Sequence, residues 1–568
     1  MLKILKDFLH NSPIFGEGLA AAAGLAERTC ILHSKMRVAK RFATQARNEN
    51  YNCTRSILFV LVLLVMVTAC GRGTSPIIEE YIQPEIPITV EAVQGFQATI
   101  ESNVYPESLL PDIPTHNEYI ISLEVDPETR TVQGISRINF TNRSGVPLDT
   151  IVLRVFLNAF NEGAYPRPYT SDLELRMHRP GSGRGYMVVE HVSLNNEALD
   201  FDLDTTVLTL NLATPLEPES TVQLLLQYSA YVPMLGHIMG GNDDAMWFGM
   251  FLPMLAVHGE HGWYTDAFYP VGSPFFFETA NFHVSVQTPI RYHVVGSGHR
   301  VEELVDDTRI TRFTTMARDF AFVVLSPYYS QASILTANGV EINFHYNSDG
   351  ANRRVDDVLE MARRSMEYFE FRVGIYPFGQ VDIVEVELLH NSVAFSQIIF
   401  ADTRHIQRGN FVELSHSLGN QWFSGIVGTN SVAEPWLDNG LTHFVQAGIS
   451  HYTPELLDAY MRQSHDAIAN RVDLYIAEGL SAYTRHSTYA EAQGRKAMLM
   501  IYYLQRRMGD DAFWAFVNQY YQEFSFQIAT GEDFIRMAEE AYGDSLEDFF
   551  DAWITRGTVP AFGSRWAR

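Results

Sequence analysis

The hydrophobic pattern of this chain changes its period once, and that change constrains the fold more than any other feature. From about Thr115 to Ser333, apolar and polar residues alternate, as in Tyr119–Val125 and Thr221–Tyr228, and turn-forming residues separate the runs. Such alternation is typical of antiparallel strands with one buried face. After a further strand at Val340–Tyr346, the apolar residues recur at helical spacing. The sequence therefore predicts an α+β chain, with an antiparallel β-rich half followed by a mainly helical half.

The helical half is expected to begin at Val355–Phe371, where apolar residues recur every three or four positions. A strand at Val381–Val386 follows. Gly509 and Gly557 are typical of residues that end helices. Further helices are expected at Phe411–Phe423, Asn439–Gln446, Gly494–Met508, Asp511–Glu523, Gly531–Ala541 and Leu546–Arg556.

Cysteine content and charge exclude several classes of function. The three cysteines are Cys30, Cys53 and Cys70, so the residues after Cys70 can form neither a disulfide nor a thiolate metal site. The formal net charge is −26, and the part of the chain after Cys70 carries 32 basic and 63 acidic residues. So acidic a body is repelled by nucleic acid and by anionic lipid headgroups. No nucleic-acid partner is expected, and attachment to a membrane would need something other than basic patches.

The residues before Cys70 have the features of an export signal. Ile57–Val67 is an uninterrupted apolar run, with basic residues upstream and the small residues Thr68 and Ala69 after it. The run is shorter than the roughly 20 residues that a membrane-spanning helix needs. The stretch Val67–Cys70 resembles a bacterial lipobox. This resemblance implies a lipid on Cys70 and a lipoprotein of the bacterial cell envelope, on the outer face of the cytoplasmic membrane. A plain transmembrane anchor ending in a chance cysteine is the alternative.

These features divide the chain into four expected parts. Residues 1–70 form a leader, and Met36 is an alternative start that would leave residues 1–35 untranslated. Residues 71–112 are rich in Pro, Glu and Ile and are expected to act as a tether. The β-rich domain is expected at 113–335 and the helical domain at 336–568.

Two segments of the helical half carry a recognisable spacing. Asn420 is followed by Gln-Trp-Phe, and Trp436-Leu-Asp-Asn-Gly440 begins sixteen residues past Asn420. This pair resembles the signature of the membrane alanyl aminopeptidase family, a group of gluzincin zinc peptidases, which reads H-E-x-x-H-Q-W-F/W and then W-L-x-E-G. The resemblance implies a β-rich saddle domain followed by a thermolysin-like, mainly helical peptidase domain. Other segments that resemble the family are Asn117–Asn142, Gly262–Tyr264, Gly272–Phe276, Arg318–Phe322, Gly509–Phe513, Asp533–Phe534 and Trp553, so the resemblance covers about residues 115–560.

The resemblance also implies where zinc and the general base would lie. In the family, two histidines one helical turn apart and a glutamate of the next helix bind zinc, and a glutamate between the histidines activates the bound water. The first histidine is present here as His416. Ser417 stands at the position of the base, Asn420 at the second histidine and Asn439 at the third ligand. One imidazole and two neutral amides are a poor set of zinc ligands.

Two further positions of the family have also changed. Ala394 stands where the resemblance implies a glutamate that binds the substrate amine. Gly494 stands where it implies a tyrosine that stabilises the oxyanion. Tyr489 could substitute for that tyrosine, but only along a bent path. The neighbouring residues Gln421, Trp422, Phe423, Trp436, Leu437 and Gly440 keep the family pattern.

Two rearranged metal sites remain open on the sequence. In a shifted register, Val412–His416 would be the metal-binding motif and would retain Glu413, at the cost of the spacing to Asn439. Alternatively, His443 follows Asn439 by four residues, on the same helix face, and could join His416 and Asn439, with Glu413, in a relocated site.

The main functional hypothesis is a membrane-anchored, catalytically inactive peptidase-like protein that binds a peptide or a protein in its cleft and needs no cofactor. One alternative is a zinc metallopeptidase, an aminopeptidase with rearranged ligands. Another is a structural subunit of an envelope complex.

Overall fold

The computed structural model describes residues 117–161, 163–164, 184–234, 237–269, 271–348, 354–388 and 391–564, which belong to one compact unit, Ile88–Arg568. The predicted leader, the tether and Cys70 lie outside the described residues. Within the described ranges, no helix is long and apolar enough to cross a membrane.

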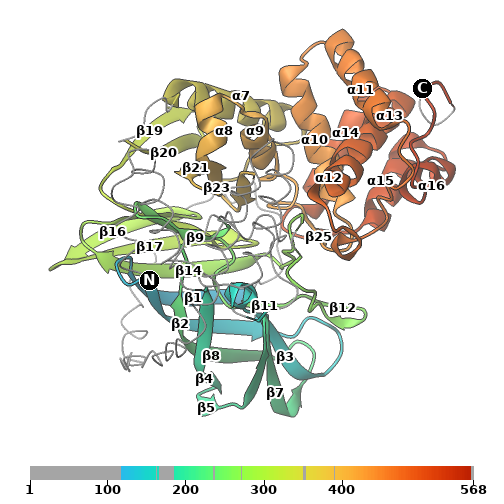
Figure 1. The fold of residues 1–568 in the computed structure, drawn as a ribbon. Helices are drawn as coiled ribbons and strands as arrows, with labels where there is room; N and C mark the ends of the chain where they lie inside the picture. The colour runs from blue at the N-terminus through green and yellow to red at the C-terminus, as the bar shows by residue number, and fades with distance from the viewer. Residues whose placement is uncertain are drawn as a thin grey trace, which may run out of the picture. The chain divides into compact units, whose positions relative to one another are not determined.

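An eight-stranded sheet forms most of the N-terminal half (Figure 1). Its strands alternate as the sequence predicts: Tyr119, Ile121, Leu123 and Val125 of β1 are buried, and the residues between them are more exposed. The prediction of an antiparallel sheet is wrong for one pair, because β1 runs parallel to β14. In spatial order the strands are β16 (His299–Val305), β17 (Thr308–Ala317), β14 (Ala280–Pro289), β1 (Asn117–Asp126), β2 (Thr131–Thr141), β8 (Thr221–Tyr231), β4 (Tyr186–Leu194) and β5 (Glu197–Ala198).

Smaller sheets complete this half. One has the order β15 (His293–Gly296), β18 (Phe322–Leu325), β10 (Ala245–Phe248), β9 (Met239–Gly241). Another has the order β11 (Met254–Leu255), β3 (Leu148–Arg154), β7 (Val207–Leu216), β6 (Phe201–Asp204). The short pair β12 (His258–Gly259) and β13 (Gly262–Trp263) forms a hairpin.

A five-stranded sheet joins the two halves. Its order is β19 (Tyr329–Leu335), β20 (Glu341–Asn347), β21 (Gln380–Val386), β23 (Ile398–Asp402), β22 (Val393–Phe395). Both faces of β21 are buried: Val381 and Ile383 belong to the core of the helical half, whereas Val384 and Val386 belong to the core of the β-rich half. Because β19 pairs with β20, this sheet begins before the predicted domain boundary at residue 335.

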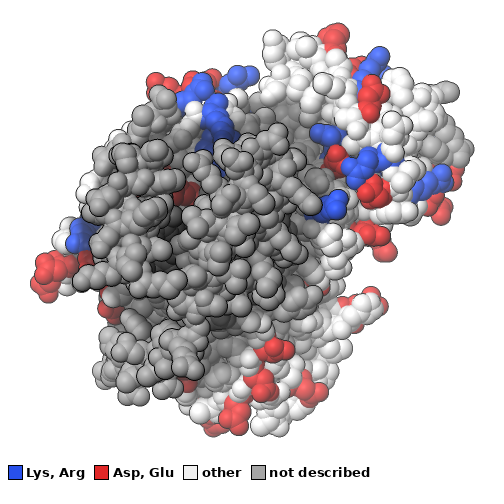
Figure 2. Space-filling model, viewed as in Figure 1, with Lys and Arg blue, Asp and Glu red and all other residues white. Residues whose placement is uncertain are grey.

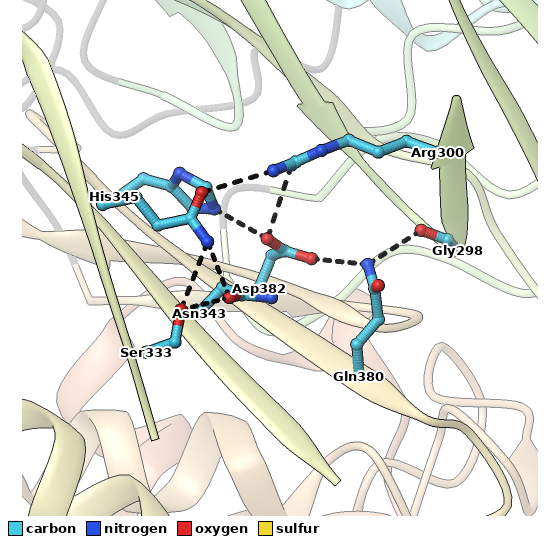
Figure 3. A network of polar contacts seen from close by, with 8 residues as sticks. Gly298, Arg300, Ser333, Asn343, His345, Gln380 and Asp382 are labelled. Carbon is cyan, nitrogen blue, oxygen red and sulfur yellow. Dashed lines mark hydrogen bonds and ion pairs between the residues drawn. The ribbon is translucent and has the colours of Figure 1, made fainter. Parts of the chain in front are cut away.

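A buried polar network ties this sheet to the β-rich half (Figure 3). Asp382 of β21 lies fully buried on the face that points to β16. Its Oδ1 atom lies 2.7 Å from His345 Nε2 and 3.7 Å from Arg300 Nη1, and its Oδ2 atom accepts a hydrogen bond of 3.0 Å from Gln380 Nε2. The charge of Asp382 is therefore satisfied by partners from both halves, as a buried carboxylate requires.

The rest of the chain is mainly helical, so the predicted α+β class is confirmed. The helices are α7 (Val355–Arg372), α8 (Thr403–Arg408), α9 (Val412–Gly419), α10 (Trp436–Ser450), α11 (Pro454–Ile468), α12 (His486–Tyr489), α13 (Ala497–Met508), α14 (Asp510–Phe524), α15 (Gly531–Tyr542) and α16 (Glu547–Ile554), with a two-stranded pair β24 (Gly428–Thr429) and β25 (Ile528–Ala529) among them. Figure 1 shows α7, α8 and α9 over the five-stranded sheet, with the later helices gathered beside them.

Three helix boundaries differ from the sequence prediction. Helix α9 ends at Gly419 rather than at Phe423, and Asn420–Val427 forms a series of tight turns. Helix α10 extends beyond the predicted range at both ends. The helix predicted at Gly494–Met508 begins earlier, as a π-helical segment at Ala490–Lys496 that leads into α13. The extra residue per turn in that segment matters for the site.

The turn after α9 is fixed by two side chains. Gln421 Oε1 accepts from Gln397 N at 2.8 Å, and Gln421 Nε2 donates to Phe395 O at 2.9 Å, so Gln421 joins α9 to the turn between β22 and β23. Trp422 is fully buried and donates to Gly374 O at 2.7 Å. These contacts hold α9 against α7 and the sheet, and thereby position the wall of the cavity described next.

Candidate functional site

A cavity of about 1380 Å³ lies between the two halves. Its walls come from the segment 268–277 of the β-rich half, from strand β22, from α9 and α10, and from the segment 484–498. Seven of the eight positions that the sequence places at the centre line this cavity: Ala394, Glu413, His416, Asn420, Asn439, His443 and Gly494. The eighth, Ser417, is buried at 2% exposure and is not among the lining residues.

Helix α9 brings His416 and Asn420 to one wall. Asn420 N donates to His416 O at 3.0 Å, so the two residues lie one helical turn apart even though α9 ends between them. The Nδ1 atom of His416 is buried and has no hydrogen-bond partner among the described residues. The carboxamide of Asn420 faces the cavity where the resemblance implies a second imidazole.

Asn439 lies in the first turn of α10, and its amide is directed mainly to its own helix. Asn439 Nδ2 donates to Pro435 O at 2.7 Å and to Asp438 Oδ1 at 2.9 Å. A longer contact of 3.3 Å joins Asn439 Nδ2 to the hydroxyl of Tyr489. The hydrogens of the amide are thus shared among acceptors within the protein.

His443 occupies the centre of the cavity wall. Its ring stacks on His416, with ring centroids 4.2 Å apart and an interplanar angle of 29°. A Cβ atom at Gly494 would lie 3.0 Å from His443 Nε2, which is tighter than ordinary contacts. The absence of a side chain at residue 494 therefore leaves room for the imidazole of His443, and the two positions are sterically coupled.

The π-helical segment brings Tyr489 into the cavity. Counting along an ordinary helix places Gly494 at the oxyanion position, and Tyr489 could reach the site only along a bent path. The π-helical turns provide such a path, and the Tyr489 hydroxyl lies 3.3 Å from Asn439. Tyr489 thus lines the cavity together with Gly494.

Glu413 and Ala394 complete the predicted set. Glu413 lines the cavity one turn before His416 and makes no hydrogen bond or ion pair with another described residue. Burial raises the pKa of its carboxyl group. Ala394, in β22, presents only a methyl group where the resemblance implies an amine-binding carboxylate.

The lining residues do not fit a zinc ion. A protein zinc site needs three or four ligand atoms that converge on one point at about 2.0 to 2.3 Å. Within the described ranges, no group of three or more His, Cys, Asp and Glu side chains lies close enough together to hold a metal ion. The stacked rings of His416 and His443 therefore have no third side chain of these types placed to share an ion with them. Both rearranged sites that the sequence left open lack a third converging ligand.

Sequence reasoning missed other polar residues of the cavity. Asp438 is buried, accepts a 2.8 Å hydrogen bond from Ser431 Oγ, and has a pKa raised to about 6, mainly by burial. Arg485 and Arg495 also line the cavity. The signal for Asp438 was its place inside the segment Trp436–Gly440, and the signal for the two arginines was their position near Gly494 in the sequence.

Because burial keeps the ring of His443 neutral, the stability of the fold is expected to depend on pH. Burial and the nearby charge of Arg495 lower the pKa of His443 to about 4, from the ordinary value of 6.5. As the pH falls from 6.5 towards 4, the unfolded chain therefore binds a proton that the folded chain does not, and stability is lost. The shift corresponds to a loss of about 3 kcal/mol at pH 4, before any allowance for solvent. Buried carboxyl groups such as Asp438 and Asp319 oppose this loss, because their pKa values are raised to about 6.

A comparison with His443→Gln isolates the contribution of His443, because glutamine does not titrate. Between pH 7 and pH 4.5, we expect the unfolding free energy, measured in urea, to fall by about 2 kcal/mol less for the variant than for the natural chain. A difference that stays constant with pH would show that His443 is not buried as a neutral ring.

Comparisons with known proteins identify the architecture. Residues 359–553 match the peptidase family M1 domain. The chain is 28% identical to aminopeptidase B of Mus musculus over 170 residues, which is 26% of each chain. It is 21% identical to aminopeptidase Q of Homo sapiens over 506 residues, which is 79% of this chain and 48% of that protein. The chain thus spans less than half the length of these curated relatives. The crystal structure of an M1 zinc metallopeptidase from Deinococcus radiodurans has the same fold, with a TM-score of 0.59 at 16% identity over 79% of this chain and 95% of that one.

Proposed function

We propose that this chain has kept the peptide-binding cleft of the M1 aminopeptidase family without the zinc-dependent chemistry. The proposal is supported by the match of residues 359–553 to the peptidase family M1 domain and by the shared fold. The observation that carries the proposal is the stacking of His443 on His416, at the point where the family would bind its metal. The remaining family positions hold a hydroxyl, two amides, a methyl group and a glycine. None of these can act as a general base near neutral pH.

The cleft itself supports a binding role. A concave cavity with a mixture of aromatic and polar walls is the usual site for a ligand. A solved structure with the same fold, from Deinococcus radiodurans, carries a Tyr-Ser-Ala substrate and has a TM-score of 0.59 at 15% identity. We infer that short peptides, or an extended segment of a protein, occupy the corresponding cavity of this chain.

A panel of unmodified tri- to hexapeptides tests this function in two measurements on the same samples. Mass spectrometry is expected to show every peptide intact after prolonged incubation with added zinc, whereas titration calorimetry is expected to detect binding of some of them. Release of N-terminal residues, abolished by a chelator, would instead establish the alternative of a zinc aminopeptidase with rearranged ligands. If the peptides are neither cleaved nor bound, the result would favour a structural subunit of an envelope complex.

Attachment to the membrane is a separate proposal that rests on Cys70 alone. We expect a lipid on this residue to hold the protein at the outer face of the cytoplasmic membrane of a bacterium. The variant Cys70→Ser should then leave the membrane fraction. Retention of this variant in the membrane would favour a plain transmembrane anchor.

A further inference from the structure

The centre of the cavity lacks the carboxylates that the family has there, whereas several hydrogen-bond donors line it. In the family, carboxylates at three positions face a metal ion, a water molecule or the amine of the substrate, and all three positions are neutral here: Ser417, Asn439 and Ala394. Such carboxylates are what makes a peptidase centre attractive to cations. Without them, the charge that remains near the centre decides what the cavity can bind.

Arg495 supplies that charge. It is half-buried, lines the cavity directly after Gly494, and lies close enough to His443 to lower the pKa of that ring. It makes no hydrogen bond or ion pair with any described residue. Many other arginines of this acidic chain are paired, as Arg471 is with Asp473 and Glu491, and Figure 2 shows basic side chains beside acidic ones over the helical half. A guanidinium cannot lose its proton near neutral pH, so the unpaired charge persists.

Two neutral groups add further donors. The Tyr489 hydroxyl receives a hydrogen bond from Asn439 Nδ2, so its own hydrogen is free for a ligand. Burial raises the pKa of this phenol far above its ordinary value, so it stays protonated. The carboxamide of Asn420 also faces the cavity and makes no side-chain hydrogen bond to a described residue.

The carboxylates that line the cavity do not cancel these donors. The carboxylate of Asp438 accepts hydrogen bonds from Ser431 Oγ at 2.8 Å and from Asn439 N at 2.7 Å. Glu491 forms an ion pair with Arg471, and Asp319 accepts a hydrogen bond of 2.7 Å from Ser396 N. Glu413 is unpaired, but it lies one turn before His416, towards the start of α9. Arg495 follows Gly494 and acts on His443, whereas burial is the one cause of the raised pKa of Glu413, with no contribution from Arg495.

We propose that the cavity recognises its peptide ligand by a carboxylate, held by the guanidinium of Arg495 and the hydroxyl of Tyr489. The inference rests on the proposed function and deepens it, because it reverses the polarity of recognition: the ligand is held by an anionic group rather than by its N-terminal amine. A guanidinium presents two parallel N–H groups that match the two oxygen atoms of a carboxylate. The carboxylate can be the C-terminus of the peptide or an acidic side chain.

Calorimetry with the full chain and blocked tripeptides tests the proposal. The probes are Ala-Phe-Ala with both ends free, with the amine acetylated, with the C-terminus amidated, and with both ends blocked. A fifth probe, acetyl-Ala-Glu-Ala-amide, carries its only carboxylate in a side chain. We expect acetylation to leave the affinity unchanged and amidation to weaken it by about tenfold or more, as loss of a charge-assisted hydrogen bond predicts. Binding of the fifth probe would show that an acidic side chain suffices, and its failure to bind would assign the site to the C-terminus.

Variants localise the effect. Arg495→Gln should bind the free tripeptide and its amide equally, and Tyr489→Phe should weaken only the free tripeptide. Arg364→Gln, at an exposed position of α7 outside the cavity, is the matched control and should behave as the natural chain does. Equal affinity of the natural chain for the free and amidated peptides would overturn the inference and leave the proposed function standing. A loss on acetylation instead would point to Glu413 and overturn the inference too. If none of the probes binds, both the inference and the proposed function are overturned.

Discussion

The variant that combines Asn420→His, Asn439→Glu and His443→Ala is expected to bind about one zinc ion per chain, a gain of at least about tenfold over the natural protein. His416 and residue 420 are one turn apart on α9, and residue 439 is in the first turn of α10, which is the arrangement that the zinc peptidases use. The three side chains would supply two imidazoles and a carboxylate from positions that already line one cavity. Inductively coupled plasma mass spectrometry after gel filtration measures the metal content.

Removal of His443 is part of this design, because its ring now stacks on His416. The matched control keeps His443 and carries only Asn420→His and Asn439→Glu. We expect this control to bind zinc more weakly, since the imidazole of His416 must first leave the stack. If the combined variant folds with the circular dichroism of the natural chain and still holds no zinc, the correspondence of residues 416, 420 and 439 with the family's ligands is wrong.

Replacement of Trp422 by alanine is expected to cost about 4 kcal/mol of unfolding free energy, a large fraction of the roughly 5–15 kcal/mol that stabilises a typical domain. The indole is fully buried, stacks on Phe369 with centroids 5.3 Å apart, and donates a hydrogen bond to Gly374 O at 2.7 Å. The variant loses packing on two sides and leaves that carbonyl group without its donor. Urea unfolding monitored by circular dichroism measures the loss.

Phe371 provides the control for this prediction. It lies at the end of α7 with 74% of its surface exposed, so Phe371→Ala should change the unfolding free energy by less than about 0.5 kcal/mol. Similar losses for both variants would mean that Trp422 does not hold α9 in place. The retained family pattern around residue 422 would then need an explanation other than packing.

Much of the fold followed from the sequence because it is encoded by local patterns. The alternation in β1 and the helical spacing in α7 both reflect burial of one face, and the structure confirms both elements. The parallel pairing of β1 with β14 could not be predicted, because it joins strands more than 150 residues apart and leaves no mark in either strand. Helix α11 was missed although its start is encoded: Thr453 caps it and Pro454 occupies its first turn.

The candidate site was predictable in its positions and less so in its contacts. His416 and Asn420 are one helical turn apart, so helix geometry places both on one wall of the cavity. The chain from Asn420 to the start of α10 is not helical, so helix geometry does not place Asn439 relative to them. The stacking of His443 on His416, and the room that Gly494 gives it, depend on how α10 and α13 approach each other. The position of Tyr489 could not be predicted for a similar reason. A π-helical segment changes the number of residues per turn, and no pattern in its sequence predicts it.

The metal content of the natural chain is the decisive observation for a cleft without a zinc centre. The natural chain, expressed in full, is incubated with excess zinc, passed over a desalting column and analysed by inductively coupled plasma mass spectrometry. We expect less than about a tenth of a zinc ion per chain, because among the described residues His416 belongs to no group of three His, Cys, Asp or Glu side chains that could hold the ion. About one zinc ion per chain, removed by a chelator and absent from His416→Ala, would contradict this expectation.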